Sequence, residues 1–358
     1  MSIATAIQNA QDKVAAAYTA VNIKGGTLPA TQDLSNLPTA ITSIPTSGGG
    51  TDNLPLFVSS GVSTFEDNTI TKIRSYAFYD NRANVVTNPI TSVSCSSVTE
   101  VGANCFTHCS SLQTISLPSL VTVGASSFEG CSSLTSLPLP STVTTIGDGS
   151  YSSCTAVTEF TIPSGVTYIS DSAFKNITNA EVVNYNATNA SFESGSNNDV
   201  FHDLGSNKNN LVFNIGSNVE NIPPYFLYPT SFGSHYPNIQ TLNISNSNSI
   251  KTIGRYAFYY CTGLTSLNLP SMTILNTSGA MTYAFSHCTN LTSLSFPSLT
   301  STSFGSYTNQ FNNMLSNVTG CTVHFPSNLQ SVIGSWTDVT NGFGGTNTTV
   351  LFDLTATE

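Results

Sequence analysis

The chain has 358 residues, a formal net charge of −10 and only 8% charged side chains, whereas soluble domains typically carry about 25%. Serine, threonine and asparagine take their place, with 52, 49 and 36 copies. Nine lysines and arginines are too few to neutralise a phosphate backbone, so we exclude nucleic-acid binding. An apolar content of 39%, placed at regular intervals, excludes a disordered chain. The short apolar runs exclude insertion into a membrane.

The N-terminal segment has neither a basic region nor a continuous apolar stretch, so we expect no secretory signal. Residues 2–23 space their apolar side chains by alternate steps of four and three, as in the seam of a short coiled coil. A second apolar-periodic stretch follows Gly25-Gly26 and runs to residue 45. Helices this short are marginal alone, which leaves two interpretations of residues 1–45. They form an intramolecular helical hairpin, or they dock onto other chains through Ile3, Ile7, Val14 and Val21.

A repeat of about 23 residues follows a Gly/Ser/Thr-rich linker and cap at residues 46–65. Its unit reads Ile-Gly-x-x-Ala-Phe-x-x-Cys-x-x-Leu-x-x-Leu-x-Leu-Pro, and it is clearest at 98–174 and 250–300. The aromatic position recurs at Phe106, Phe128, Tyr151 and Phe174. No single unit of this length buries its own apolar groups, so the units are expected to stack into a solenoid.

Each part of the unit predicts a local structure. The Leu-x-Leu-Pro segment predicts a strand with alternate side chains inward, such as Ile115 and Leu117, and the proline ends the strand. We expect these strands to form one continuous parallel sheet. The Ile-Gly segment predicts a second short strand closed by a glycine turn, and Ala-Phe-x-x-Cys predicts one helical turn with Phe and Cys in the core.

The repeat is weaker between residues 175 and 249. Val182-Val183 predicts one strand, residues 211–222 predict a strand pair, and Phe226 falls in the aromatic position. The polar stretch 190–209 predicts an insertion that forms a surface loop.

Five of the eight cysteines occupy one position of the repeat, which predicts a ladder of free, buried thiols. They are Cys109, Cys131, Cys154, Cys261 and Cys288. Disulfide bonds and a metal site are the alternatives, but His108 and His287 only precede ladder cysteines and lack the paired spacing of zinc ligands. We therefore expect no metal.

No catalytic motif is present, so we expect a non-enzymatic protein without a cofactor. Asp148 and Asp171 recur in one repeat position, which indicates turn residues rather than an acid/base pair. Surface recognition remains, and its candidate residues are Tyr76, Tyr79, Tyr256, Tyr259 and Tyr260. The alternative is that these tyrosines only cover the edge formed by the turns.

The repeat resembles the BspA-type leucine-rich repeat family over about residues 66–330. This resemblance implies a β-rich α/β repeat solenoid, with the helical hairpin or coiled-coil module in front and a cap at 331–358. The segments 22–32 and 36–45, with the closing segment from Cys321 onward, are similar to modules of tail and fibre proteins of bacteriophages of gut bacteria.

The second resemblance implies a structural protein of the virion, placed in a tail, fibre or baseplate. Its N-terminal module would bind other virion proteins, and its repeats would bind a host-surface glycan or protein. Fibre-like appendages also suggest a homo-oligomer, with a trimer as our expectation. The alternative is a BspA-like adhesin on the bacterial cell surface.

Overall fold

The computed structural model describes residues 63–79, 89–193, 199–208, 211–228, 239–273, 275, 281–300, 311–333 and 343–355. They belong to two compact units, Met1–Val143 with Gly147–Ala156, and Thr144–Ile146 with Val157–Glu358. Ile3, Ile7, Val14 and Val21 lie outside the described residues, as do the module 1–45 and most of the linker 46–65.

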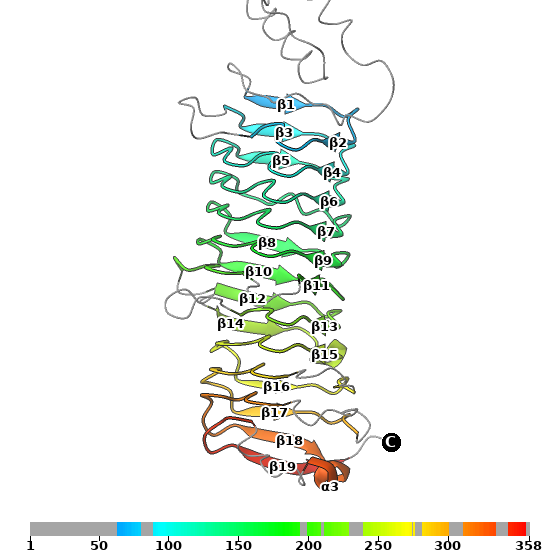
Figure 1. The fold of residues 1–358 in the computed structure, drawn as a ribbon, viewed down its shortest axis with the longest axis vertical. Coiled ribbons are helices and arrows are strands. Elements are labelled where there is room, and N and C mark those ends of the chain that lie inside the picture. Colours follow the sequence, from blue (N-terminus) through cyan, green and yellow to red (C-terminus); the bar gives the residue numbers. More distant parts are fainter. Residues whose placement is uncertain are drawn as a thin grey trace, which may run out of the picture. The chain divides into compact units, whose positions relative to one another are not determined.

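The first unit is a stack of coils, each of which contributes strands to parallel sheets (Figure 1). The main sheet contains β1 (Thr64–Glu66), β3 (Ser92–Ser94) and β5 (Thr114–Ser116). The second sheet contains β2 (Lys72–Ile73), β4 (Glu100–Val101) and β6 (Thr122–Val123). Successive coils therefore pair strand on strand, as the repeat predicts.

The second unit repeats this arrangement. One main sheet contains β8 (Glu159–Ile162), β10 (Val182–Tyr185), β12 (Leu211–Ile215) and β14 (Ile239–Ile244). Another contains β16 (Ser266–Asn268), β17 (Ser293–Ser295), β18 (Thr322–Pro326) and β19 (Thr349–Leu354). Six of these main strands, β8, β10, β12, β14, β18 and β19, are longer than those of the first unit. The short strands are β7 (Thr145–Ile146), β9 (Tyr168–Ile169), β11 (Ser191–Phe192), β13 (Asn221–Ile222) and β15 (Thr252–Ile253).

The main strands are parallel but form three separate sheets, so the prediction of one continuous sheet is wrong. The coil with Leu134, Leu137 and Leu139 forms no main strand. Pro138 and Pro140 lie within and after that segment, and proline has no N–H to donate to a ladder. The main sheet is interrupted again between β14 and β16.

The core of the first unit is a stack of aromatic rings, one from each coil. Phe78, Phe106, Phe128 and Tyr151 are fully buried, and neighbouring rings lie 4.7 to 5.4 Å apart at angles of 8° or less. This stacking brings the coils close together at the Ile-Gly segment. A Cβ on Gly124 would lie 2.6 Å from the carbonyl carbon of Gly102, which explains the glycine in this coil.

The Ala-Phe-x-x-Cys segment forms consecutive turns, so the predicted helical turn is wrong. The residue before Ala and the residue before Cys both adopt left-handed backbone angles, as Asn104 (φ 54°) and His108 (φ 62°) illustrate. A right-handed helix cannot continue through them. Their amides bond to the next coil instead, since Asn104 N–H donates to Ala125 O at 2.8 Å. Phe and Cys do lie in the core, as predicted.

The fold is therefore a β-solenoid with almost no helix in its described part. The helical segments there are η1 (Ser247–Ser249), η3 (Ser327–Leu329) and α3 (Gln330–Ile333). None of them is long or apolar enough to cross a membrane.

The weakly repetitive region also belongs to the solenoid. Strands β10, β12 and β13 confirm the strands predicted at 182–183 and 211–222. Phe226 is buried but does not take the aromatic position, contrary to the prediction. Leu227 takes it, because Leu227 N–H donates to Ala257 O as Phe258 N–H donates to Ala284 O. The described part of 190–209 is not a surface loop, contrary to the prediction. Phe201 is 3% exposed and stacks on Phe174 at 5.6 Å. Five apolar side chains in this polar stretch are buried, namely Ala190, Phe192, Val200, Phe201 and Leu204.

Candidate recognition surface

The turns of the second unit carry a column of tyrosines. Tyr225, Tyr256 and Tyr283 each precede the Ala or Phe of their coil and have φ angles of 60°, 57° and 55°. Their rings are stacked, with centroids 5.2 and 4.9 Å apart and interplanar angles of 7° and 6°. The same position holds small residues at Asn104, Ser126, Gly149 and Ser172, and another tyrosine, Tyr76 (φ 62°), in the first unit.

A second column lies at the residue before Cys. Tyr260 and His287, both at φ 62°, stack with centroids 4.1 Å apart. Nε2 of His287 is 2.9 Å from Nδ2 of Asn317, and Nδ1 is 2.9 Å from Oγ of Ser286. Tyr259 lies between the columns, 5.9 Å from the Tyr256 ring and 5.0 Å from the His287 ring. Tyr228 lies beside the first column, 5.0 Å from the Tyr256 ring and 5.1 Å from the Tyr259 ring. We call these seven residues the aromatic edge: Tyr225, Tyr228, Tyr256, Tyr259, Tyr260, Tyr283 and His287.

The aromatic edge is nearly free of charge. Burial, followed by the neighbouring tyrosines, raises the pKa of Tyr256, and burial lowers the pKa of His287. Both groups are therefore neutral at neutral pH. The guanidinium of Arg255 is in contact with the edge, since its Cζ lies 5.1 Å from the centroid of the Tyr225 ring.

The stacking decides what the edge presents to a partner. A ring inside a column has both faces covered, so it presents its rim and its phenolic hydroxyl rather than a flat platform. Asn313 Nδ2 donates to the Tyr283 hydroxyl at 3.0 Å, which continues the row with an amide. The surface thus offers hydrogen-bonding groups at the spacing of the coils.

The five predicted tyrosines divide between the two units. In the first unit Tyr76 is 47% exposed and meets Tyr79 edge-on at 5.5 Å. In the second unit Tyr256 and Tyr260 are half-buried. Tyr259 is only 8% exposed, so its prediction as an exposed residue is wrong, because the surrounding rings enclose it.

Sequence reasoning missed Tyr225, Tyr228, Tyr283 and His287 as members of the aromatic edge. The signal was available for Tyr283, which precedes Ala284-Phe285 as Tyr256 precedes Ala257-Phe258. Tyr225 was hidden because its coil lacks the Ala-Phe-x-x-Cys pattern.

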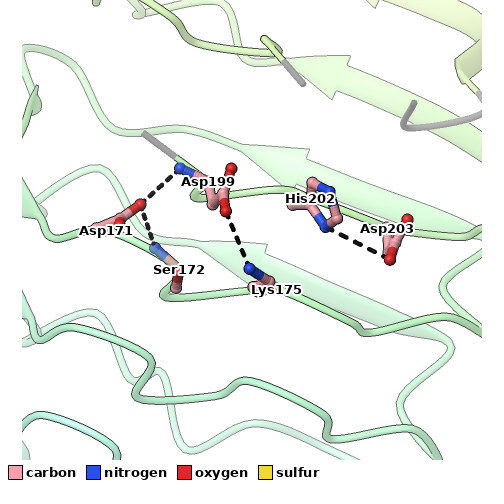
Figure 2. A network of polar contacts seen from close by, with 6 residues as sticks. All are labelled: Asp171, Ser172, Lys175, Asp199, His202 and Asp203. Atoms are coloured by element: carbon pink, nitrogen blue, oxygen red, sulfur yellow. Dashed lines mark hydrogen bonds and ion pairs between the residues drawn. The ribbon is translucent and has the colours of Figure 1, made fainter. Parts of the chain in front are cut away.

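A separate polar network links two coils of the second unit, as Figure 2 shows. Asp171 Oδ1 accepts the backbone N–H groups of Ser172 at 2.8 Å and of Asp199 at 2.5 Å. Lys175 Nζ lies 2.9 Å from Asp199 Oδ2. His202 Nδ1 lies 3.4 Å from Asp203 Oδ2. Asp171 thus caps a turn and joins neighbouring coils, and Asp148 is exposed.

The cysteines form the expected ladder of thiols. All eight are free and buried. The thiols of Cys109, Cys131 and Cys154 lie 2.9, 3.1 and 3.2 Å from the backbone carbonyl oxygen of the phenylalanine in the preceding coil. Burial raises the pKa of Cys154 to about 12. Throughout the described ranges, no three His, Cys, Asp or Glu side chains gather as metal ligands.

Both units are solenoids of stacked, leucine-containing β-coils, which is the architecture of leucine-rich repeat proteins. The model of the BspA type leucine rich repeat region matches six copies in residues 71–203 and 227–336. These ranges cover about two thirds of the chain, and the protein belongs to this family.

Solved structures with similar coils include a leucine rich cell surface protein from Faecalibacterium prausnitzii. It is 17% identical, with 81% of this chain and 88% of that chain covered and a TM-score of 0.40. A leucine rich repeat protein from T. pallidum is 24% identical, with 43% and 66% covered and a TM-score of 0.36. One from Bacteroides ovatus is 18% identical, with 79% and 88% covered and a TM-score of 0.27. Matches at these scores carry no functional argument, and no curated protein matches significantly.

Proposed function

We propose that this protein is a non-enzymatic attachment protein whose solenoid binds a glycan or protein on a host cell surface. The observation that supports it is the placement of tyrosine at left-handed positions of the aromatic edge. A left-handed angle costs a residue with a side chain about 1–2 kcal/mol, and asparagine or glycine tolerates it better. Two other coils hold asparagine or glycine at the same position, namely Asn104 and Gly149.

The stacking of the rings offsets this cost within the column, since an aromatic pair contributes about 0.5–1.5 kcal/mol. The coils with small residues at this position show that the solenoid forms without such a column. A row of half-buried tyrosines has a further use, because tyrosine is enriched at the energetic centres of binding interfaces. Strained residues concentrate at such sites.

The partner that suits this edge is uncharged or weakly charged. Phenolic hydroxyls and amides donate and accept hydrogen bonds, and the chain as a whole carries few charges. Attachment should therefore vary little with salt, unlike binding that is steered by charge.

Conservative variants test the role of the edge. Asparagine tolerates the left-handed angle, so the Tyr256→Asn and Tyr283→Asn variants should unfold at the same thermal midpoint as the parent. Attachment of the fluorescently labelled full chain to a panel of gut bacteria should fall at least about tenfold. The matched control is Ser126→Asn, at the same repeat position of the first unit. Unchanged attachment by both tyrosine variants would contradict the role of the edge.

We further propose that the protein is a structural component of a bacteriophage virion. The similarity of its front and closing segments to phage tail and fibre modules supports this placement. Residues 1–45 would bind other virion proteins through Ile3, Ile7, Val14 and Val21, and we propose a trimer. Mass spectrometry of purified particles should detect the protein, and deletion of residues 1–45 should remove it from them. A truncated protein that still assembles would place the docking surface elsewhere.

The second candidate is a BspA-like adhesin on the bacterial cell surface, which the family supports. Protease treatment of intact cells separates the two. An adhesin is digested on the producing cell, whereas a virion protein is recovered with particles. Neither placement involves nucleic acid, a cofactor or insertion into a membrane.

A further inference from the structure

A polar hollow lies on the outward face of the sheet formed by β8, β10 and β12, at the C-terminal ends of these strands. Its volume is about 420 Å³. The residues that line it come from three successive coils of the second unit: Thr161, Pro163, Ser164, Asn186, Ser217 and Asn218.

The hollow exists because of the residues that directly follow the three strands. Asn186 N–H donates to Ile162 O at 3.0 Å and Gly216 N–H donates to Tyr185 O at 2.9 Å, so the parallel pairing continues there. Gly216 has no side chain, and a Cβ on it would collide with Oδ1 of Asn186. Pro163 on the other side is compact. Asn186 therefore stands between two short neighbours, and the space above them stays open.

An asparagine ladder runs beside the hollow and ends at one of its lining residues, Thr161. Asn243 Nδ2 donates to Asn214 Oδ1 at 2.8 Å, and Asn214 Nδ2 donates to Asn184 Oδ1 at 2.8 Å. Asn184 Nδ2 in turn lies 3.4 Å from Oγ1 of Thr161. The ladder joins side chains that the strand register places side by side.

Most of the polar side chains that line the hollow have no hydrogen-bond partner within the described residues, in contrast to the asparagines of the ladder. Across the part of the chain that the structure describes, four lining side chains make no hydrogen bond. They are Ser164, Asn186, Ser217 and Asn218. Two hydroxyls and two amides each supply donors and acceptors. None of the six lining residues carries a charge.

We propose that this hollow binds one uncharged sugar unit of a surface glycan. Sugar hydroxyls are donors and acceptors at once, which matches paired amides and hydroxyls. Pro163 adds an apolar part to the lining for the C–H face of the ring. The volume lies within the range of about 300–1,000 Å³ for small-molecule sites, and the absence of charged lining residues favours neutral over acidic sugars. The proposal deepens the attachment function and rests on it for its biological purpose.

Saturation-transfer NMR and titration calorimetry on the full chain test the proposal. The probes are the methyl glycosides of glucose, galactose, mannose and N-acetylglucosamine, with methyl glucuronide as the charged comparison. At least one neutral glycoside should bind saturably and at least about tenfold more tightly than the glucuronide. Binding of none of the neutral probes would overturn the proposal, and so would equal binding of the glucuronide.

Two variants locate the binding. Asn186→Ala removes the central amide and Gly216→Thr fills the hollow, and each should weaken binding at least about tenfold. Ser245→Ala, in the turn after β14 and outside the lining, is the matched control and should bind as the parent does. If Gly216→Thr lowers the thermal midpoint, its loss of binding could reflect instability, and the test of the hollow then rests on Asn186→Ala. Retained binding in Asn186→Ala would overturn the proposal.

The outcome is separable from that of the attachment function. If the full chain attaches to cells but binds no glycoside, the hollow is not a sugar site and attachment through the aromatic edge stands. If a glycoside binds in the hollow but the chain attaches to no cell, the site stands and the attachment function fails.

Discussion

Replacement of Phe128 by alanine should strongly destabilise the first unit, because this ring lies in the middle of the aromatic stack. Phe128 is fully buried, 5.2 Å from the Phe106 ring and 5.4 Å from the Tyr151 ring. A buried Phe→Ala change costs about 3–5 kcal/mol. We expect about 4–5 kcal/mol here, because two stacked pairs, each worth about 0.5–1.5 kcal/mol, disappear together.

Urea unfolding followed by circular dichroism measures this loss. Because coils stabilise only their neighbours, the variant should also show a lower m value, as local unfolding of these coils precedes that of the others. Tyr76→Ala is the control, since its ring is 47% exposed, and it should cost less than about 1 kcal/mol. A loss below about 2 kcal/mol for Phe128→Ala would refute the view that ring stacking holds the coils together.

Four further predictions concern the reactivity of the thiols, their effect on stability at high pH, the glycines and the asparagine ladder. None of the eight buried thiols should react with a thiol reagent in the native protein at pH 8, and all should react in denaturant; a fast-reacting native thiol would contradict their burial. Burial raises the pKa of Cys154 and of Cys288 from 9.0 to about 12, so the folded state retains protons that the unfolded state releases. Their contribution to stability should be complete below pH 9 and be lost as the pH rises towards 12; urea midpoints measured across this range check the sign. Gly124→Ala should cost about 1–3 kcal/mol, because its Cβ meets backbone atoms. Gly216→Ala should cost less than about 1 kcal/mol, because its Cβ meets the tip of a movable side chain; equal losses would show that close contact between coils is not the reason for the glycine. Asn214→Ala removes two hydrogen bonds of 2.8 Å and should lower the free energy of unfolding by about 1–2 kcal/mol, and an unchanged urea midpoint would show that the ladder adds nothing.

The sequence by itself determined the repeating unit and most of the core. Phe106, Phe128 and Cys131 were predicted to be buried, since the same residue types recur at one spacing, and a solenoid turns that spacing into direct stacking. The prediction held in the weaker region too, where the alternation of Leu211, Phe213 and Ile215 marks strand β12. Periodicity is a local property, so the order of residues is enough to reveal it.

Only the tertiary structure decided features that depend on neighbouring coils. Asn104 and His108 take left-handed angles while backbone amides of their segment bond to the next coil, and no pattern within one unit predicts that. Phe201 joins the core although the residues around it are polar. The aromatic edge and the hollow arise in the same way. Tyr225 and Tyr256 are 31 positions apart but stack at 5.2 Å, and Gly216 opens a hollow because it lies beside Asn186. These contacts form between coils, so they require the register of the stack, which the sequence of a single repeat does not specify.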